Sequence, residues 1–236
     1  MLTLLSFPRP VAALALLGGL LAGTPARAQH QVYDPLPPPG SAYLRFVNGL
    51  GDAVALRPDF LPAQTLGTAP EQRVSAYQVV EKVAGRTLGL RMQQGGQDSE
   101  ARLTVAPGSF VTVILEASGE ASGRGIDAVP VVDRTEFNQS RARLTFYNAT
   151  PGCAAATLAL DPDGPAVFQD VAPGSARSRS VNPVSARLKA GCDGQAAPAF
   201  ALEGLEAGGM YSVWLMRPGE APTAFLTRDA TARWRP

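Results

Sequence analysis

Apolar and polar residues alternate along 42–48, and the same pattern returns at 142–148 with Ala, Leu, Phe and Asn in matching places. A second pair of segments, 107–115 and 207–215, keeps the same offset and runs from a turn glycine into an apolar stretch. Alternation with a period of two is typical of β-strands with one buried face. Two matches in phase predict an internal duplication in which each copy forms its own β domain.

The remaining pattern predicts further short strands, separated by turns rich in Gly, Pro and Asp such as the one at 95–98. In the first copy we expect strands near 42–48, 52–57, 86–92, 101–106, 110–116 and 126–132. In the second copy we expect them near 142–148, 154–160, 165–169, 184–190, 199–202, 210–217 and 222–227. The Ala- and Leu-rich segment 154–160 could instead be a helical turn. No longer segment has a helical period, so the sequence predicts an all-β protein of two tandem β-sandwich domains.

The N-terminus has the features of a secretory signal. Arg9 precedes the apolar run 11–23, and Ala26-Arg27-Ala28 supplies an A-x-A cleavage site. The run is too short to span a bilayer, and no later stretch is apolar for long enough to form a transmembrane helix. We therefore expect cleavage after Ala28, export to the periplasm and no membrane span in the mature chain.

These features give a prediction for the domain organisation. The parts are a signal peptide at 1–28, a proline-rich lead-in at 29–41, a first β-sandwich at 42–132, a linker at 133–141 and a second β-sandwich at 142–236.

The charge of the chain argues against one class of partner. The 21 basic and 20 acidic residues nearly balance, and no basic cluster is interleaved with aromatic residues. Nucleic acid is therefore not expected as a partner.

The inventory of reactive side chains is poor. The single histidine is His30, two residues beyond the predicted cleavage site, and the two lysines, Lys82 and Lys189, belong to no Ser-x-x-Lys motif. A Ser-His-Asp or Cys-His centre needs a base held on a rigid element, and a zinc or iron site needs several His or Cys ligands. We expect no catalytic residue, no metal site and no cofactor, although the acidic residues leave a pair of carboxylates acting on a glycosidic bond open.

Both cysteines, Cys153 and Cys192, fall in the second copy. Exported proteins meet oxidising conditions, so we predict that the two residues form a disulfide. The alternative is two separate thiols, either buried or reactive.

Four polar or aromatic residues are candidates for binding. Arg45 and Asn48, on the first strand and at its end, could bond to a partner or to sugar hydroxyls, and Asn182 could do so before Pro183. The competing interpretation is favoured for Asn48 and its counterpart Asn148, since Asn readily caps a turn. Asn182-Pro183 can likewise simply begin a turn.

The two tryptophans differ in their surroundings. Trp214 lies among apolar residues on both sides of its strand, so burial in the core is expected. Trp234 lies close to the C-terminus between Arg233 and Arg235. It is either a disordered tail residue or a contact for another protein.

Four segments, in order along the chain, carry a resemblance to a known family. The segment 33–48 has a Tyr, several Pro and Gly-Ser before a strand with Arg and Asn, and 130–143 contains a Phe-Asn pair. The segment 181–184 contains Asn-Pro-Val, and 210–218 ends in Trp-Leu-x-Arg-Pro. Together they resemble the AlgF family, the periplasmic accessory proteins of alginate O-acetylation, whose interdomain linker corresponds to 130–143.

The resemblance implies two tandem β-sandwiches similar to carbohydrate-binding modules, with no catalytic residues of their own. It also implies a role as an adaptor in the O-acetylation of alginate or a related exopolysaccharide. The partners would be periplasmic SGNH-type acetyltransferases, a membrane O-acyltransferase complex and the polysaccharide itself. The alternative function is a carbohydrate-binding or envelope-structural β-sandwich module without a role in acetylation.

Overall fold

The computed structural model describes residues 37–119, 125–136 and 138–235. The predicted signal peptide, His30 and most of the proline-rich lead-in lie outside these residues. Among the described residues, no helix is both long enough and apolar enough to cross a bilayer.

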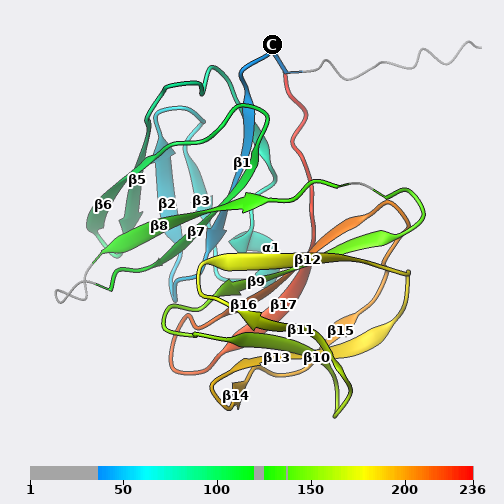
Figure 1. The fold of residues 1–236 in the computed structure, drawn as a ribbon. Coiled ribbons are helices and arrows are strands. Elements are labelled where there is room, and N and C mark those ends of the chain that lie inside the picture. Colours follow the sequence, from blue (N-terminus) through cyan, green and yellow to red (C-terminus); the bar gives the residue numbers. More distant parts are fainter. Residues whose placement is uncertain (1–36, 120–124, 137, 236) are drawn as a thin grey trace, which may run out of the picture. The chain divides into compact units, whose positions relative to one another are not determined.

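The first copy consists of two four-stranded sheets (Figure 1). One sheet has the order β4-β1-β7-β8, and the other has the order β3-β2-β5-β6. The elements are β1 (Ala42–Asn48), β2 (Val54–Pro58), β3 (Gln64–Leu66), α1 (Pro70–Arg73), β4 (Gln78–Val80), β5 (Leu88–Gln94), β6 (Gln97–Leu103), β7 (Phe110–Ala117) and β8 (Ile126–Asp133). Gly95 and Gly96, both at positive φ, form the two-residue turn between β5 and β6, as such tight hairpins require.

The second copy repeats this arrangement. Its sheets have the orders β12-β9-β16-β17 and β11-β10-β13-β14, with β15 also paired to β13. The strands are β9 (Ala142–Ala149), β10 (Ala156–Leu160), β11 (Ala166–Val171), β12 (Ser175–Val181), β13 (Ala186–Cys192), β14 (Gln195–Ala196), β15 (Phe200–Leu202), β16 (Met210–Met216) and β17 (Thr223–Arg228). The all-β sandwich fold predicted from the sequence is therefore confirmed.

The pairing register also matches between the copies. β1 runs parallel to β7 with Arg45 opposite Thr112, and β9 runs parallel to β16 with Thr145 opposite Ser212. Each of these residues lies one hundred positions from its counterpart, as the sequence repeat predicts. The domain boundaries remain a prediction, and Asp133, placed in the linker from the sequence, forms the end of β8.

The residues that the two copies share are core residues. Ala42, Leu44 and Phe46 are fully buried between the two sheets of the first copy, and their counterparts in β9 are buried in the second. The intervening residues of β1 and β9 differ, for example Val47 against Tyr147. Their side chains point to the opposite face of each sheet.

These outward faces form a third buried cluster, which contains residues from both copies. It comprises Val47, Ile114, Val131, Tyr147, Ala149, Trp214, Met216 and Phe225. The sheets β4-β1-β7-β8 and β12-β9-β16-β17 therefore pack against each other through faces that the repeat does not conserve. This packing positions the polar network described below.

Several elements were not predicted. β3, β4, β14 and α1 are only two to four residues long, too short for a pattern to show. β12 has the sequence Ser-Ala-Arg-Ser-Arg-Ser-Val, which favours a loop by composition, but pairing with β9 along its whole length holds it as a strand. The segment 154–160, for which a helical turn was the alternative, contains β10.

The predicted disulfide is confirmed. Cys153 and Cys192 are bonded, with their Cα atoms 5.9 Å apart, and both side chains belong to the buried core of the second copy. The bond joins the turn after β9 to the end of β13.

Candidate functional site

The guanidinium of Arg45 is buried between the sheets β4-β1-β7-β8 and β12-β9-β16-β17. Arg45 is only 1% exposed. Its Nε donates to Thr112 Oγ1 at 2.8 Å, and its Nη1 donates to Asp229 Oδ1 at 2.6 Å. Its Nη2 donates to Tyr147 OH at 2.9 Å and to Ser212 Oγ at 3.0 Å. Arg45 from the first copy thus bonds to three residues of the second half of the chain.

Three aromatic rings surround the same guanidinium. The Arg45 Cζ atom lies 4.4 Å from the ring centre of Tyr77, 5.0 Å from that of Trp214 and 5.4 Å from that of Tyr147. Tyr147 and Trp214 also stack, with ring centres 4.2 Å apart. Rings at these distances stabilise a cation most strongly where water is excluded.

Asp133 accepts hydrogen bonds from three hydroxyl groups in this network. Its Oδ2 accepts from Thr112 Oγ1 at 2.7 Å and from Tyr77 OH at 2.8 Å, while its Oδ1 accepts from Tyr147 OH at 2.5 Å. Two hydroxyls that hold Asp133, those of Thr112 and Tyr147, also accept from Arg45. The acid, the hydroxyls and the guanidinium therefore form one connected network.

Burial and neighbouring charges act on the pKa values in opposite directions. Burial raises the pKa of Asp133, while the Arg45 charge and the three hydroxyl bonds oppose that rise. Burial by itself lowers the pKa of Arg45, but the acidic groups around it outweigh burial and raise it above the ordinary value. Burial also raises the pKa values of Tyr77 and Tyr147, so both phenols remain protonated donors. The arrangement stabilises a permanent cation between the sheets.

The raised pKa of Asp133 gives a pH prediction. A carboxyl group with a raised folded-state pKa binds its proton more tightly when folded, so its contribution is present at acid pH and is lost as pH rises through that pKa. In urea unfolding at pH values from 3 to 7, the stability difference between wild type and Asp133→Asn should therefore favour wild type most at the acid end. Asp98→Asn, at an exposed position, is the matched control. A difference that grows in favour of wild type as pH rises would contradict this prediction.

The network is suited to joining the two copies rather than to catalysis, because its acid, hydroxyl and guanidinium groups are already bonded to one another. Within the part of the chain that the structure describes, no group of three or more His, Cys, Asp or Glu residues could hold a metal ion. Arg45, a candidate for binding from the sequence, is placed in the interior of this network instead of at a surface.

Asn48 has the turn-capping role that the sequence favoured. It is fully buried, its Nδ2 donates to the carbonyls of Asp52 and Gly67, and its Oδ1 accepts from the Leu50 N–H. These bonds satisfy backbone groups where the chain leaves β1.

Asn148 repeats the arrangement in the second copy. Its Nδ2 donates to the carbonyls of Cys153 and Val171, and its Oδ1 accepts from the Thr150 N–H. The shared Asn of the sequence repeat is therefore a turn residue in both copies.

Asn48→Ala and Asn148→Ala should each lower the free energy of unfolding by about 1–3 kcal/mol, because each leaves buried backbone groups unpaired. Chemical denaturation monitored by fluorescence would measure both. Asn182→Ala, at an exposed position between β12 and β13, is the control and should have little effect. A loss no greater than that of the control would show that the turns do not depend on these side chains.

The remaining candidates lie apart from the Arg45 network. Asn182 is exposed. Trp234 is half-buried, and its Nε1 donates to Glu81 Oε1 at 3.0 Å. It therefore makes a contact within its own chain, which neither alternative from the sequence described. Trp214 is fully buried, as expected, and its Nε1 donates to Thr227 Oγ1 at 2.8 Å.

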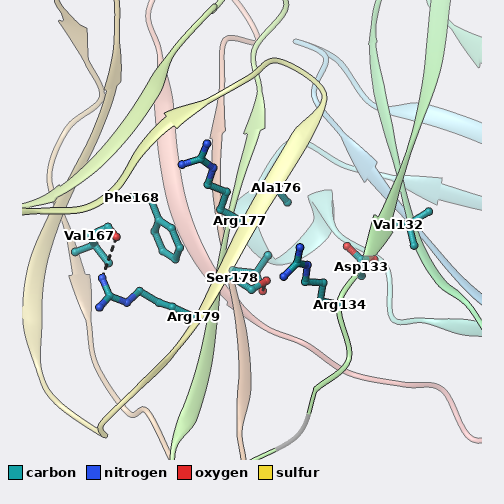
Figure 2. A pocket seen from close by; sticks show the side chains of 10 residues that line it. Val132, Asp133, Arg134, Val167, Phe168, Ala176, Arg177, Ser178 and Arg179 are labelled. Carbon is teal, nitrogen blue, oxygen red and sulfur yellow. Dashed lines mark hydrogen bonds between the residues drawn. The ribbon is translucent and has the colours of Figure 1, made fainter.

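A second polar feature was not predicted at all. A cleft of about 440 Å³ lies beside β12, and we name it the arginine cleft after Arg134, Arg177 and Arg179 (Figure 2). Arg177 and Arg179 extend from β12, and each donates through Nη1 to a backbone carbonyl of β11, at Gln169 and Val167 respectively. Arg134 follows the end of β8.

Sequence patterns give little indication of the Arg45 network. Asp229, Tyr77 and Asp133 lie far from Arg45 along the chain, and their proximity depends on how the two outward faces pack. The available indication is that Arg45 is charged, whereas the other residues of its strand are mostly apolar. A charge there requires a partner if the outward face is buried.

Comparisons with known proteins identify no family for the chain. No protein-family model and no curated protein matches the sequence. Among solved structures, a family 26 carbohydrate-binding module of Eubacterium rectale Amy13K, crystallised with maltoheptaose, matches at 11% identity and TM-score 0.25, covering 83% of this chain and all (100%) of that one. A putative cell adhesion protein of Bacteroides ovatus matches at 12% identity and TM-score 0.25, covering 84% and 99%. The Bacillus anthracis TIE protein matches at 11% identity and TM-score 0.24, covering 75% of this chain and 34% of that one.

At such low identities and TM-scores, these similarities carry no argument about a ligand or a partner.

Proposed function

We propose that this protein is an exported, non-catalytic adaptor in the O-acetylation of a polysaccharide, alginate or a related exopolysaccharide. Its partners are periplasmic SGNH-type acetyltransferases and a membrane O-acyltransferase complex. The proposal is supported by the resemblance of four segments, in order along the chain, to accessory proteins of this process. In this role the chain provides binding surfaces and no catalytic groups.

The observation that carries the proposal is the Arg45 network. An adaptor must hold its binding surfaces in a fixed geometry, and Arg45, which is only 1% exposed, bonds residues of both copies. Directional bonds to a buried cation favour one arrangement over others that simple hydrophobic packing would allow. The sheets β3-β2-β5-β6 and β11-β10-β13-β14, together with the outermost strand β12, then remain as surfaces for partners.

A second candidate is a polysaccharide-binding module with no role in acetylation. The outer face of the sheet β3-β2-β5-β6 favours it, because a hollow of about 760 Å³ lies there among Arg57, Arg91, Glu100 and Arg102. Charged and hydrogen-bonding side chains of this kind can bond to the hydroxyls and carboxylates of a sugar chain.

The deciding experiment compares the exopolysaccharide of a clean deletion strain with that of the same strain complemented by the wild-type gene. Proton NMR measures the O-acetyl content, and the polymer yield is measured separately. Polymer made in normal amount but without acetyl groups is the result expected for the adaptor. Unchanged acetylation would overturn the adaptor proposal and leave the second candidate.

A further inference from the structure

We propose that the arginine cleft binds an acidic, extended peptide segment of a protein partner, which adds as a strand to the unpaired edge of β12. The inference rests on the proposed adaptor function, and it names the site and the way in which a partner would dock.

The backbone of β12 offers an edge for pairing. Among the described residues, β12 is the outermost strand of the sheet β12-β9-β16-β17, with no strand paired to its other edge, and all seven of its residues pair with β9. Residues from both faces of β12 line the cleft, Arg177 and Arg179 from one face and Ala176 and Ser178 from the other. The cleft therefore runs along the free edge, where backbone groups of an edge strand can bond to an added strand.

The charges along this edge favour an acidic segment. Arg177 and Arg179 are two residues apart and point to the same side of β12, so their spacing of about 7 Å matches that of alternate side chains on an added strand. Each guanidinium uses its Nη1 on a β11 carbonyl. A guanidinium has five N–H donors, so the remaining ones can bond to a carboxylate, and the bond to β11 fixes its orientation.

The acidic residue of the cleft does not cancel this charge. Asp133 lines the cleft, but its oxygens accept from three hydroxyls and it lies in the field of Arg45. Arg134, which follows Asp133, adds a third guanidinium to the lining. The cleft is therefore positive where the added strand would lie.

A sugar chain fits this cleft less well. Sugar rings are held on exposed aromatic faces, and the one aromatic residue lining the cleft, Phe168, is only 7% exposed. The hydroxyls of Thr145 and Ser178, which could meet sugar hydroxyls, already bond to each other at 2.9 Å. An unpaired strand edge, by contrast, is used directly by a peptide.

The simplest competing role for these arginines is to protect the edge from unwanted pairing. Charged side chains on edge strands commonly do this, and the bonds of Arg177 and Arg179 to β11 fit such a role. Edge protection alone does not require Arg134, which follows β8 of the other copy and lines the same cleft. The two roles differ in whether an acidic peptide binds.

The test uses the mature protein and a fluorescent peptide in which Glu alternates with Thr, measured by anisotropy at low ionic strength. We expect saturable binding, and we expect a peptide with Gln in place of Glu to bind at least about tenfold more weakly. The double variant Arg177→Gln/Arg179→Gln and the single variant Arg134→Gln should each weaken binding by about tenfold or more. Arg187→Gln/Arg217→Gln removes the same charge as the double variant at two exposed positions that do not line the cleft, and it should leave the affinity within about twofold.

Backbone methylation tests the strand geometry. Two further peptides carry N-methyl groups on alternate residues, in one phase or the other. Because only one edge of an added strand pairs with β12, one phase should abolish binding and the other should preserve it. Equal binding of both phases would overturn strand addition, and unchanged affinity of the arginine variants would overturn the site.

Two further outcomes are equally decisive. If an oligomer of a (1→4)-linked uronic acid displaces the peptide and itself binds with an affinity that the Arg177→Gln/Arg179→Gln variant loses, the cleft is a glycan site and the peptide proposal fails. Peptide binding together with unchanged polymer acetylation in the deletion strain would retain the docking site and reject the acetylation role.

Discussion

Replacing Arg45 with methionine is expected to lower the free energy of unfolding by about 3–5 kcal/mol. The substitution leaves Asp229, whose side chain is only 10% exposed, without the cation 2.6 Å away, and it removes the donor to Tyr147 and Ser212. Breaking one member of a buried ion pair costs more than the pair contributes, because the other charge stays buried and uncompensated. Urea unfolding monitored by tryptophan fluorescence would measure the loss, since Trp214 lies beside the guanidinium.

The control is Arg91→Met. Arg91 pairs with Glu100 at 3.1 Å, but the two side chains are 78% and 73% exposed, so its loss should change stability by no more than about 1 kcal/mol. The double variant Arg45→Met/Asp229→Asn should recover part of the stability, since the orphaned carboxylate is removed. Equal losses for Arg45→Met and Arg91→Met would show that the buried network does not hold the two copies together.

Much of the fold could be predicted, because most of the residues that recur in the repeat belong to the buried core. Ala42, Leu44, Phe46 and Asn48 recur in the second copy because each copy needs the same buried face and the same turn at the end of its first strand. A structural requirement that occurs in both copies therefore leaves a repeated pattern in the sequence. The disulfide could be predicted for a different reason, since exported proteins meet oxidising conditions and two cysteines allow only one intramolecular pair.

The candidate site could not be predicted in the same way. Arg45 bonds to Asp229, which is 184 residues distant in the chain, and no local pattern encodes a contact over that separation. Strand β12 shows the same limit, because its polar sequence becomes a strand only through β9. The arginine cleft depends on both, since β12 and the end of β8 must meet before its three guanidinium groups share one surface.

Removing the disulfide is expected to cost roughly 4 kcal/mol, by the loss of loop-closure entropy for the 39-residue separation between Cys153 and Cys192. The variant Cys153→Ala/Cys192→Ala keeps small apolar side chains at two buried core positions, so the loss of the covalent bond should dominate. Guanidinium unfolding of the variant and of wild type, each with and without reductant, gives four free energies to compare.

Reductant should bring wild type close to the variant and should leave the variant unchanged. Because the cysteines lie only in the second copy, the added instability should also be confined there, and amide hydrogen exchange can locate it. Strands β9, β10 and β13 should exchange faster in the variant, while β1, β2 and β5 of the first copy should keep their protection until the whole chain unfolds. Faster exchange of equal size in both copies would instead mean that the Arg45 network couples the two into one cooperative unit, and the disulfide would then stabilise the entire scaffold.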